Sequence, residues 1–142
     1  MKVIVAGDRL IEDYEEVKKA IKDSGFKITE LISGGAKGCD LLGEKWAKEN
    51  NIKITQFIPE WDNIERKGAD VKTNNWGKKY DRLAGVVRNE RMAKCSDACI
   101  AIQKQGEPSP GTQNMIKVAK ENNLKVHVHT IVKPDSDFDY KF

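Results

Sequence analysis

Short apolar runs alternate with amphipathic stretches along the chain, and this alternation constrains the fold more than any other feature. Five runs have the β-branched, buried character of strands, at residues 2–6, 28–33, 52–58, 97–102 and 125–131. Each of the first four precedes a stretch with helical spacing of its apolar residues, at residues 13–24, 38–50, 85–95 and 112–122. Strands joined by crossover helices form parallel sheets. We therefore predict an α/β fold: a single Rossmann-like, three-layer domain over residues 1–142, with a mainly parallel five-stranded sheet in the order 3-2-1-4-5.

The composition is that of a globular protein without a membrane segment. Charged residues make up 33% of the chain and hydrophobic residues 39%, and no run approaches the roughly 20 apolar residues that span a bilayer. The N-terminal MKVIVAGDR lacks the long apolar region of a signal peptide, so we interpret it as a first strand. The cysteines lack zinc-ligand spacing, and reduced thiols suit a cytosolic protein. We therefore expect a cytoplasmic protein with no membrane partner.

Residues 60–82 interrupt the regular pattern. The segment has no clear period, contains Trp61 and Trp76, and is too long for a passive connection in a compact domain. It overlaps a basic region, because residues 65–91 carry eight lysines and arginines against four acidic residues. We predict that residues 60–82 form a lid whose tryptophans stack on a base and whose lysines close over phosphates. A partly disordered insertion is the alternative.

Three glycine-bearing corners follow predicted strands. They are GDR at residues 7–9, SGGAKGCD at residues 33–40 and SPGT at residues 109–112. Because the carboxyl ends of parallel strands meet at one edge of a sheet, we expect all three corners on the same rim, beside the point where the strand order reverses. Glycine lets backbone N–H groups approach a ligand closely, and helix N-termini attract anions. The corners therefore predict a phosphate or pyrophosphate site, although strand-to-helix turns also need glycine for their own geometry.

The predicted third helix adds polar groups to this rim. Arg88 and Asn89 lie in its first turn, where a guanidinium can grip phosphate and an amide can read a sugar or a base edge. No nucleotide P-loop is present, because no Gly-Lys-Ser/Thr triplet follows the second corner. The predicted ligand-binding residues are Gly7, Asp8, Arg9, Ser33, Gly34, Gly35, Ala36, Lys37, Asp40, Trp61, Trp76, Arg88, Asn89, Met92, Ser109, Gly111 and Thr112.

Other chemistry-bearing residues give weaker signals. His127 and His129 share one face of a strand, but no further ligand at suitable spacing completes a metal site, so we expect neither a metal nor a cofactor. Cys39 lies at a helix start, where thiolates are stabilised, but no base is positioned to activate it as a nucleophile. The tail, residues 132–142, carries alternating aromatics that we expect to dock on the sheet or a partner chain, or to fray: Phe138, Tyr140 and Phe142.

Four motifs together carry a family resemblance. VIVAGDR, SGGAKGCDLLGEKWA, AGVVRNERMAKCSDACIAI and SPGTQNMIKVA resemble, in this order, the YspA-like branch of the SLOG superfamily, over about residues 2–131. That superfamily includes the LOG phosphoribohydrolases, which are lysine-decarboxylase-like, and the Rossmann domain of DprA. The branch is common in phage and mobile-element genomes, so the resemblance implies such a source.

The resemblance implies a nucleotide-derived ligand, such as an ADP-ribose-like molecule or a cyclic nucleotide signal, and self-association into a homo-oligomer. A phage protein of this kind would sequester a host defence signal without turning it over. The related hydrolases carry a catalytic glutamate where this chain has Met115, and a thioether cannot move a proton. Turnover is therefore not expected, unless Asp8, Asp40 or Glu44 substitutes. Two alternatives are an N-glycosidase or phosphoribohydrolase, and a DprA-like single-stranded nucleic-acid binder; nucleic acid is the less expected partner, because little basic surface lies outside residues 60–82.

Overall fold

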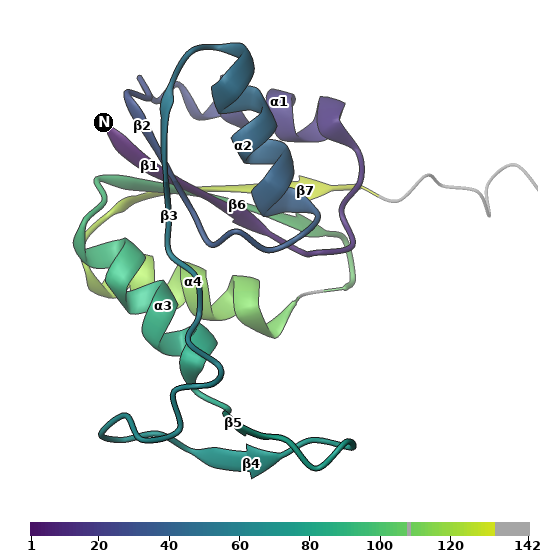
Figure 1. The fold of residues 1–142 in the computed structure, drawn as a ribbon. Helices are drawn as coiled ribbons and strands as arrows, with labels where there is room; N and C mark the ends of the chain where they lie inside the picture. Colours follow the sequence, from purple (N-terminus) through teal and green to yellow (C-terminus); the bar gives the residue numbers. More distant parts are fainter. Residues whose placement is uncertain (108, 133–142) are drawn as a thin grey trace, which may run out of the picture.

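The computed structural model describes residues 1–107 and 109–132 of the chain (Figure 1). Five strands form one parallel sheet in the order β3-β2-β1-β6-β7, which confirms the predicted order of the sheet. These strands are β1 (Lys2–Gly7), β2 (Glu30–Ser33), β3 (Lys53–Gln56), β6 (Ala98–Lys104) and β7 (Lys125–Ile131). The three aromatic residues of the tail lie outside the described residues.

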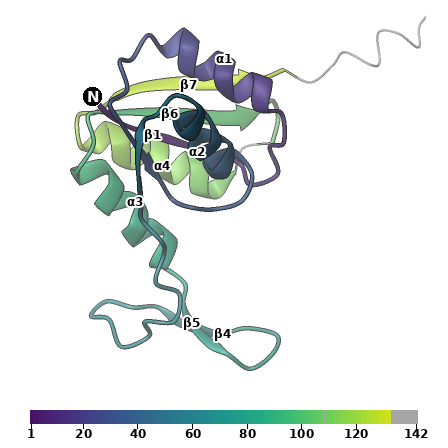
Figure 2. The same ribbon diagram turned by 45° about the horizontal axis from the view of Figure 1, so that its top comes forward.

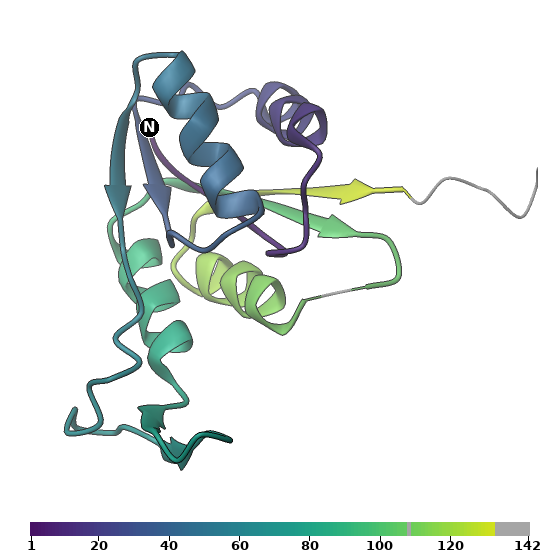
Figure 3. The same ribbon diagram turned by 45° about the vertical axis from the view of Figure 1, so that its right-hand side comes forward.

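Four helices cover the two faces of this sheet, so the domain has the expected three layers. The helices are α1 (Tyr14–Ser24), α2 (Cys39–Glu49), α3 (Ala84–Lys94) and α4 (Pro110–Glu121). The first two pack on one face and the last two on the other (Figures 1 and 3). Among the described residues, no helix combines the length and the apolar character that a membrane crossing requires.

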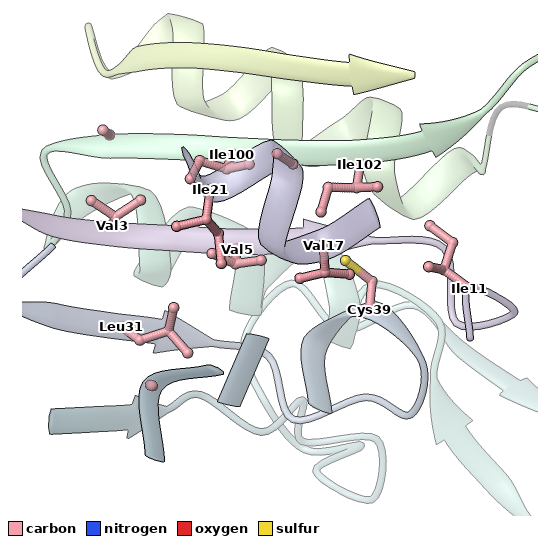
Figure 4. Close-up of a cluster of buried hydrophobic side chains, with 12 residues drawn as sticks. Val3, Val5, Ile11, Val17, Ile21, Leu31, Cys39, Ile100 and Ile102 are labelled. Carbon is pink, nitrogen blue, oxygen red and sulfur yellow. The ribbon is translucent and has the colours of Figure 1, made fainter. Parts of the chain in front are cut away.

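Successive side chains along each strand point to opposite faces of the sheet, and this explains why helices cover both faces. In β1, Val3 and Val5 point to the α1/α2 side, whereas Ile4 points to the α3/α4 side, and all three are completely buried. Figure 4 shows the first of these two cores, which gathers Val17 and Ile21 of α1 with buried residues of β1, β2, α2 and β6. Central parallel strands that are apolar on both faces require a helix layer on each side.

The segment at residues 60–82 is folded and contains two strands that the sequence pattern did not reveal. β4 (Val71–Thr73) and β5 (Lys79–Asp81) pair antiparallel as a separate hairpin. In all three ribbon views the hairpin lies beyond the N-terminal end of α3, away from the five-stranded sheet (Figures 1, 2 and 3). Strands this short and this exposed carry no alternating apolar pattern, so periodicity alone could not find them.

One buried ion pair fixes the base of this hairpin. The Asp81 carboxylate is 1% exposed and accepts hydrogen bonds from Nε and Nη2 of Arg66, at 3.0 and 2.9 Å. The same carboxylate accepts the backbone N–H groups of Asp70 and Leu83, each at 3.0 Å. A buried carboxylate that uses all these donors holds both ends of the segment against the start of α3.

A close approach at the end of β1 makes Gly7 a sensitive position. A Cβ atom there would lie 2.5 Å from the carbonyl oxygen of Ile102 and 2.7 Å from Sγ of Cys39. We predict that Gly7→Ala lowers the free energy of unfolding by about 1–3 kcal/mol, because the two central strands must move apart. At Gly85 in α3 the added Cβ meets only Trp61, at 3.5 Å, so Gly85→Ala should leave stability unchanged or slightly raised. Urea unfolding of both variants checks this, and equal stabilities would contradict it.

Candidate functional site

A cavity of about 490 Å³ lies at the carboxyl ends of β1 and β6, the two strands at which the strand order reverses. All three glycine-bearing corners contribute to it, together with α3. The predicted residues that line it are Gly7, Asp8, Arg9, Ala36, Asp40, Arg88, Asn89, Met92, Ser109, Gly111 and Thr112. The corners therefore converge on one rim.

The remaining predicted residues do not line this cavity. They are Ser33, Gly34, Gly35, Lys37, Trp61 and Trp76. The lining also includes residues outside the predicted set: Ala6, Leu10, Glu107, Pro110 and Met115. Met115 was singled out only through the comparison with the related hydrolases, although its spacing of four positions from Gly111, on the same face of α4, also indicates a place in the lining. No periodic spacing could indicate Glu107, because it belongs to an irregular loop.

The corner between β2 and α2 is occupied by the chain's own side chains. Ser33 Oγ accepts the Gly35 N–H at 3.0 Å, and Asp40 Oδ2 accepts the Ala36 N–H at 3.3 Å. The Ser33 hydroxyl in turn donates to the buried carboxylate of Glu44, at 2.7 Å. The amides of Gly35 and Ala36 are thus already bonded within the chain, and the carboxylate of Asp40 takes the Ala36 donor that an external anion would need.

Several glycines of the rim are explained by internal packing. A Cβ on Gly34 would lie 2.4 Å from Nη1 of Arg88, and a Cβ on Gly38 would lie 2.2 Å from the carbonyl oxygen of Arg9. Gly111 differs, because a Cβ there would meet only Ser109 Oγ, at 3.9 Å. The bare backbone of Gly111 therefore leaves open space in the cavity, which internal packing does not require.

The start of α4 is the open helix terminus of the site. Ser109 is the N-cap residue, but its side chain makes no capping hydrogen bond, and Pro110 at the first helical position has no N–H. The next two residues, Gly111 and Thr112, line the cavity, and their first-turn N–H groups have no partner within the helix. A helix start of this kind favours an anion.

Arg88 and Asn89 connect two of the corners through α3. Nη1 of Arg88 donates to the carbonyl oxygen of Gly34 at 2.9 Å, and its Nε donates to Oδ1 of Asn89 at 3.0 Å. Nδ2 of Asn89 then donates to Oδ1 of Asn114 at 2.8 Å and to the carbonyl oxygen of Gly111 at 3.4 Å. Both ends of this 5% exposed amide are engaged, so Asn89 holds the wall of the cavity and has no free group for a base edge. Nη2 of Arg88 takes no part in these bonds and is the part of the guanidinium that can meet a ligand.

Asp40 is a carboxyl group that titrates near neutral pH. It is 6% exposed, and burial raises its pKa to about 6, with a further rise from the charge of Glu44. The Ala36 N–H and the Arg88 guanidinium act in the opposite direction. Glu44 lies one turn further along α2, and its carboxylate accepts hydrogen bonds from Gln56 as well as Ser33. A perturbed carboxyl group in a cavity wall is typical of a functional site.

The cavity combines charges of both signs. Arg9 is exposed, and no salt bridge joins it to an acidic side chain of residues 1–107 and 109–132. Asp8 turns one carboxylate oxygen back to the N–H of Leu10, at 2.8 Å. Ala6, Met92 and Met115 supply an apolar part of the wall. The site can therefore hold a molecule with a phosphate, hydrogen-bonding hydroxyls and a flat apolar portion.

Cys39 and His129 have structural roles. Cys39 is completely buried, and burial raises the pKa of its thiol well above the usual value, so it is not an accessible thiolate. Nε2 of His129 lies 2.7 Å from a carboxylate oxygen of Glu16, which ties β7 to α1. Among the described residues no three His, Cys, Asp or Glu side chains gather closely enough to hold a metal ion.

Fold and cavity together define an α/β domain of Rossmann type with a polar pocket at the carboxyl rim of its sheet. The model of the YAcAr family, described as the YspA, cpYpsA-related SLOG family, matches residues 1–64 and confirms the resemblance over that part. The Gene 61 protein of Mycobacterium phage D29 is 24% identical over 135 residues, covering 88% of this chain and 93% of the relative.

A solved structure shares the fold. The X-ray structure of DNA processing protein A (DprA) from Streptococcus pneumoniae matches with a TM-score of 0.62 and 21% sequence identity, covering 88% of this chain. The match covers 48% of DprA, so this chain corresponds to about half of that protein. At this identity the likeness establishes the Rossmann-like fold.

The raised pKa of Asp40 predicts a pH dependence of stability. Since the folded pKa is about 6 and the ordinary value is 3.8, the folded state retains a proton that the unfolded state loses between these pH values. The contribution of Asp40 to stability therefore falls as pH rises through this window, by at most about 3 kcal/mol. Asp40→Asn removes this fall. Urea unfolding at pH 4 and pH 7 should show the variant gaining on the wild type as pH rises, and a constant difference between them would contradict the assignment.

Proposed function

We propose that the protein binds a nucleotide-derived small molecule in the rim cavity and contacts its phosphate at the start of α4. The observation that carries the proposal is the open helix terminus at Gly111 and Thr112, beside the exposed cation of Arg9. Backbone donors, a helix dipole and an arginine are the groups that bind a phosphate most effectively. The cavity volume of about 490 Å³ lies within the range of small-molecule sites.

Other groups of the cavity suit the rest of such a ligand. The free carboxylate oxygen of Asp8 can accept hydroxyl groups of a ribose, and Leu10, an exposed apolar residue of the lining, can contact a base. Trp61 and Trp76 lie outside the cavity, so we do not assign the base to them. Arg88 would contribute Nη2 while the rest of its guanidinium keeps the wall in place.

The ligand class we favour is an ADP-ribose-like molecule or a cyclic nucleotide, held without turnover. The similarity to a phage protein supports a phage source. For a protein from such a source, we extend the proposal to sequestering a host defence signal in the cytoplasm of the infected cell. Met115 supports capture over turnover, because it is 1% exposed in the cavity wall at the position of the glutamate that the related hydrolases use. We extend the proposal to a homo-oligomer, as the resemblance implies.

A second candidate function rests on Asp40. A carboxyl group with a pKa of about 6 in the cavity wall can donate a proton to a departing base or accept one from water. In that case the protein hydrolyses the N-glycosidic bond of a nucleotide: water adds to C1′ of the ribose, and the base leaves with a proton.

Mass spectrometry of the small molecules that the protein retains separates the two functions. The purified protein is incubated with AMP, ADP-ribose and cyclic AMP. One portion of the mixture is analysed directly for free base, and the other is passed through a desalting column, denatured and analysed for retained ligand. Capture predicts recovery of one intact ligand at up to one equivalent per chain. Free base in molar excess over protein in the unfractionated mixture would instead support hydrolysis. Neither retained ligand nor released base would contradict both functions.

Filling the open position at Gly111 provides a direct prediction. Gly111→Leu should weaken binding of the recovered ligand at least tenfold, because its side chain occupies cavity space and the Cβ atom from which it starts meets only Ser109 Oγ, at 3.9 Å. Lys117→Leu on the same helix, where the side chain is 75% exposed, is the matched control and should bind normally. Isothermal titration calorimetry measures both affinities, with unfolding curves to verify that each variant is folded. Unchanged affinity in Gly111→Leu would place the ligand elsewhere.

A further inference from the structure

The tip of the β4–β5 hairpin presents a tryptophan to solvent on a defined turn. Trp76 is 87% exposed, the largest exposed fraction among the apolar residues of the described chain. Oδ1 of Asn74 accepts the backbone N–H groups of Trp76 and Lys78, both at 2.9 Å, and the N–H of Asn74 pairs with the carbonyl oxygen of Lys78 at 2.9 Å. Gly77, with φ of 79°, completes the turn. The backbone thus holds an indole ring in water, where it contributes nothing to the core.

The base of the hairpin is as well defined as its tip. The buried Asp81–Arg66 pair fixes one end, and the N–H of Asp81 donates to the carbonyl oxygen of Trp61 at 2.8 Å. The N–H of Arg82 likewise donates to the carbonyl oxygen of Asp70, at 2.8 Å. The hairpin is therefore a preorganised projection, and a partner that binds it need not order it first.

The charge of the hairpin selects the kind of partner. Residues 71–80 contain three lysines and no acidic residue. Lys72 lies opposite Tyr80 in the register, so a cation and a second aromatic ring share one face. Lys78 contacts Asp62 at 3.0 Å and Lys72 contacts Asp70 at 4.0 Å, but these pairs are solvent-exposed and weak enough to be exchanged for phosphates. Lys79 has no ion pair within the described residues.

We propose that the hairpin formed by residues 71–80 binds single-stranded nucleic acid. An unpaired base stacks on Trp76, and adjacent phosphates contact Lys72, Lys78 and Lys79. Exposed aromatic rings among lysines are the usual combination for single strands, because every base offers a flat face to a ring and every nucleotide a phosphate to a cation. A duplex hides its base faces and would leave the indole unused. An ordinary protein interface, in contrast, is depleted of lysine around its aromatic residues.

This surface is separate from the rim cavity. Among the described residues of the segment 60–82, none lines the cavity, and the hairpin projects beyond α3 in each ribbon view (Figures 1, 2 and 3). The proposal therefore does not depend on the small-molecule function, and either one can fail without the other.

Fluorescence anisotropy with a labelled 15-nucleotide single-stranded DNA of mixed sequence tests the proposal. Trp76→Ala should weaken binding about 5- to 150-fold, the range found when a stacking ring is removed, and Trp76→Phe should retain most of the affinity. Lys72→Ala combined with Lys79→Ala should also weaken binding. The matched control is Lys53→Ala combined with Lys117→Ala, which removes the same charge from side chains 73% and 75% exposed elsewhere, and it should bind nearly as the wild type.

The salt dependence gives an independent readout. Three lysine–phosphate contacts predict a slope of about −2 for the logarithm of the binding constant against the logarithm of salt concentration. Wild-type affinity retained in Trp76→Ala, equal losses in both double-lysine variants, or tighter binding of the matching duplex would each overturn the proposal. One further result would overturn the proposal: no binding at low salt, together with a concentration-dependent self-association that Trp76→Ala abolishes. That result would assign the tip of the hairpin to a contact with a second copy of the chain. Since Trp76 is exposed, its replacement leaves the fold intact. Because the hairpin is separate from the rim cavity, Gly111→Leu should bind the oligonucleotide normally.

Discussion

The hydrogen-bonded bridge made by Arg88 and Asn89 is the interaction on which the rim depends. These neighbours on α3 reach in opposite directions, Arg88 to the carbonyl oxygen of Gly34 and Asn89 to Asn114 and the carbonyl oxygen of Gly111. Two loops that are 54 and 22 residues away in sequence are thereby held on either side of one helix. Asn89 is buried with both ends of its amide bonded, and the half-buried Arg88 is held through Nε and Nη1, so the bridge gives the cavity wall a single arrangement.

The two glycine-bearing loops that the bridge contacts both resemble anion sites in sequence, but they differ in structure. The loop after β2 has the glycines of an anion cradle, but the Asp40 carboxylate and the Arg88 guanidinium already occupy it. The helix start after β6 has one glycine, no side-chain cap and open space in front of it. A chain that fills one potential anion site with its own carboxylate directs external anions to the other site.

Much of this architecture could be predicted from the sequence, because strongly apolar strands and amphipathic helices report their own burial. The order of the sheet followed from chain topology, and the convergence of the corners followed from the rule for carboxyl ends of parallel strands. What could not be predicted is which corner is open to a ligand and which is filled by the chain's own side chains. Whether a glycine serves a ligand or a neighbouring side chain depends on contacts such as Arg88 with Gly34, which join distant positions. The hairpin was missed for another reason, since its stability comes from the buried carboxylate of Asp81 and from no apolar pattern.

The central claim is that an external phosphate binds at the start of α4 and not in the loop after β2. Two-dimensional NMR of ¹⁵N-labelled protein titrated with AMP tests it most directly, because each backbone N–H reports its own hydrogen bonding. Saturable shifts of the Gly111 and Thr112 resonances, with those of Gly35 and Ala36 nearly unchanged, are the expected result. Shifts concentrated at Gly35 and Ala36, or no saturable shift at either site, would contradict the account.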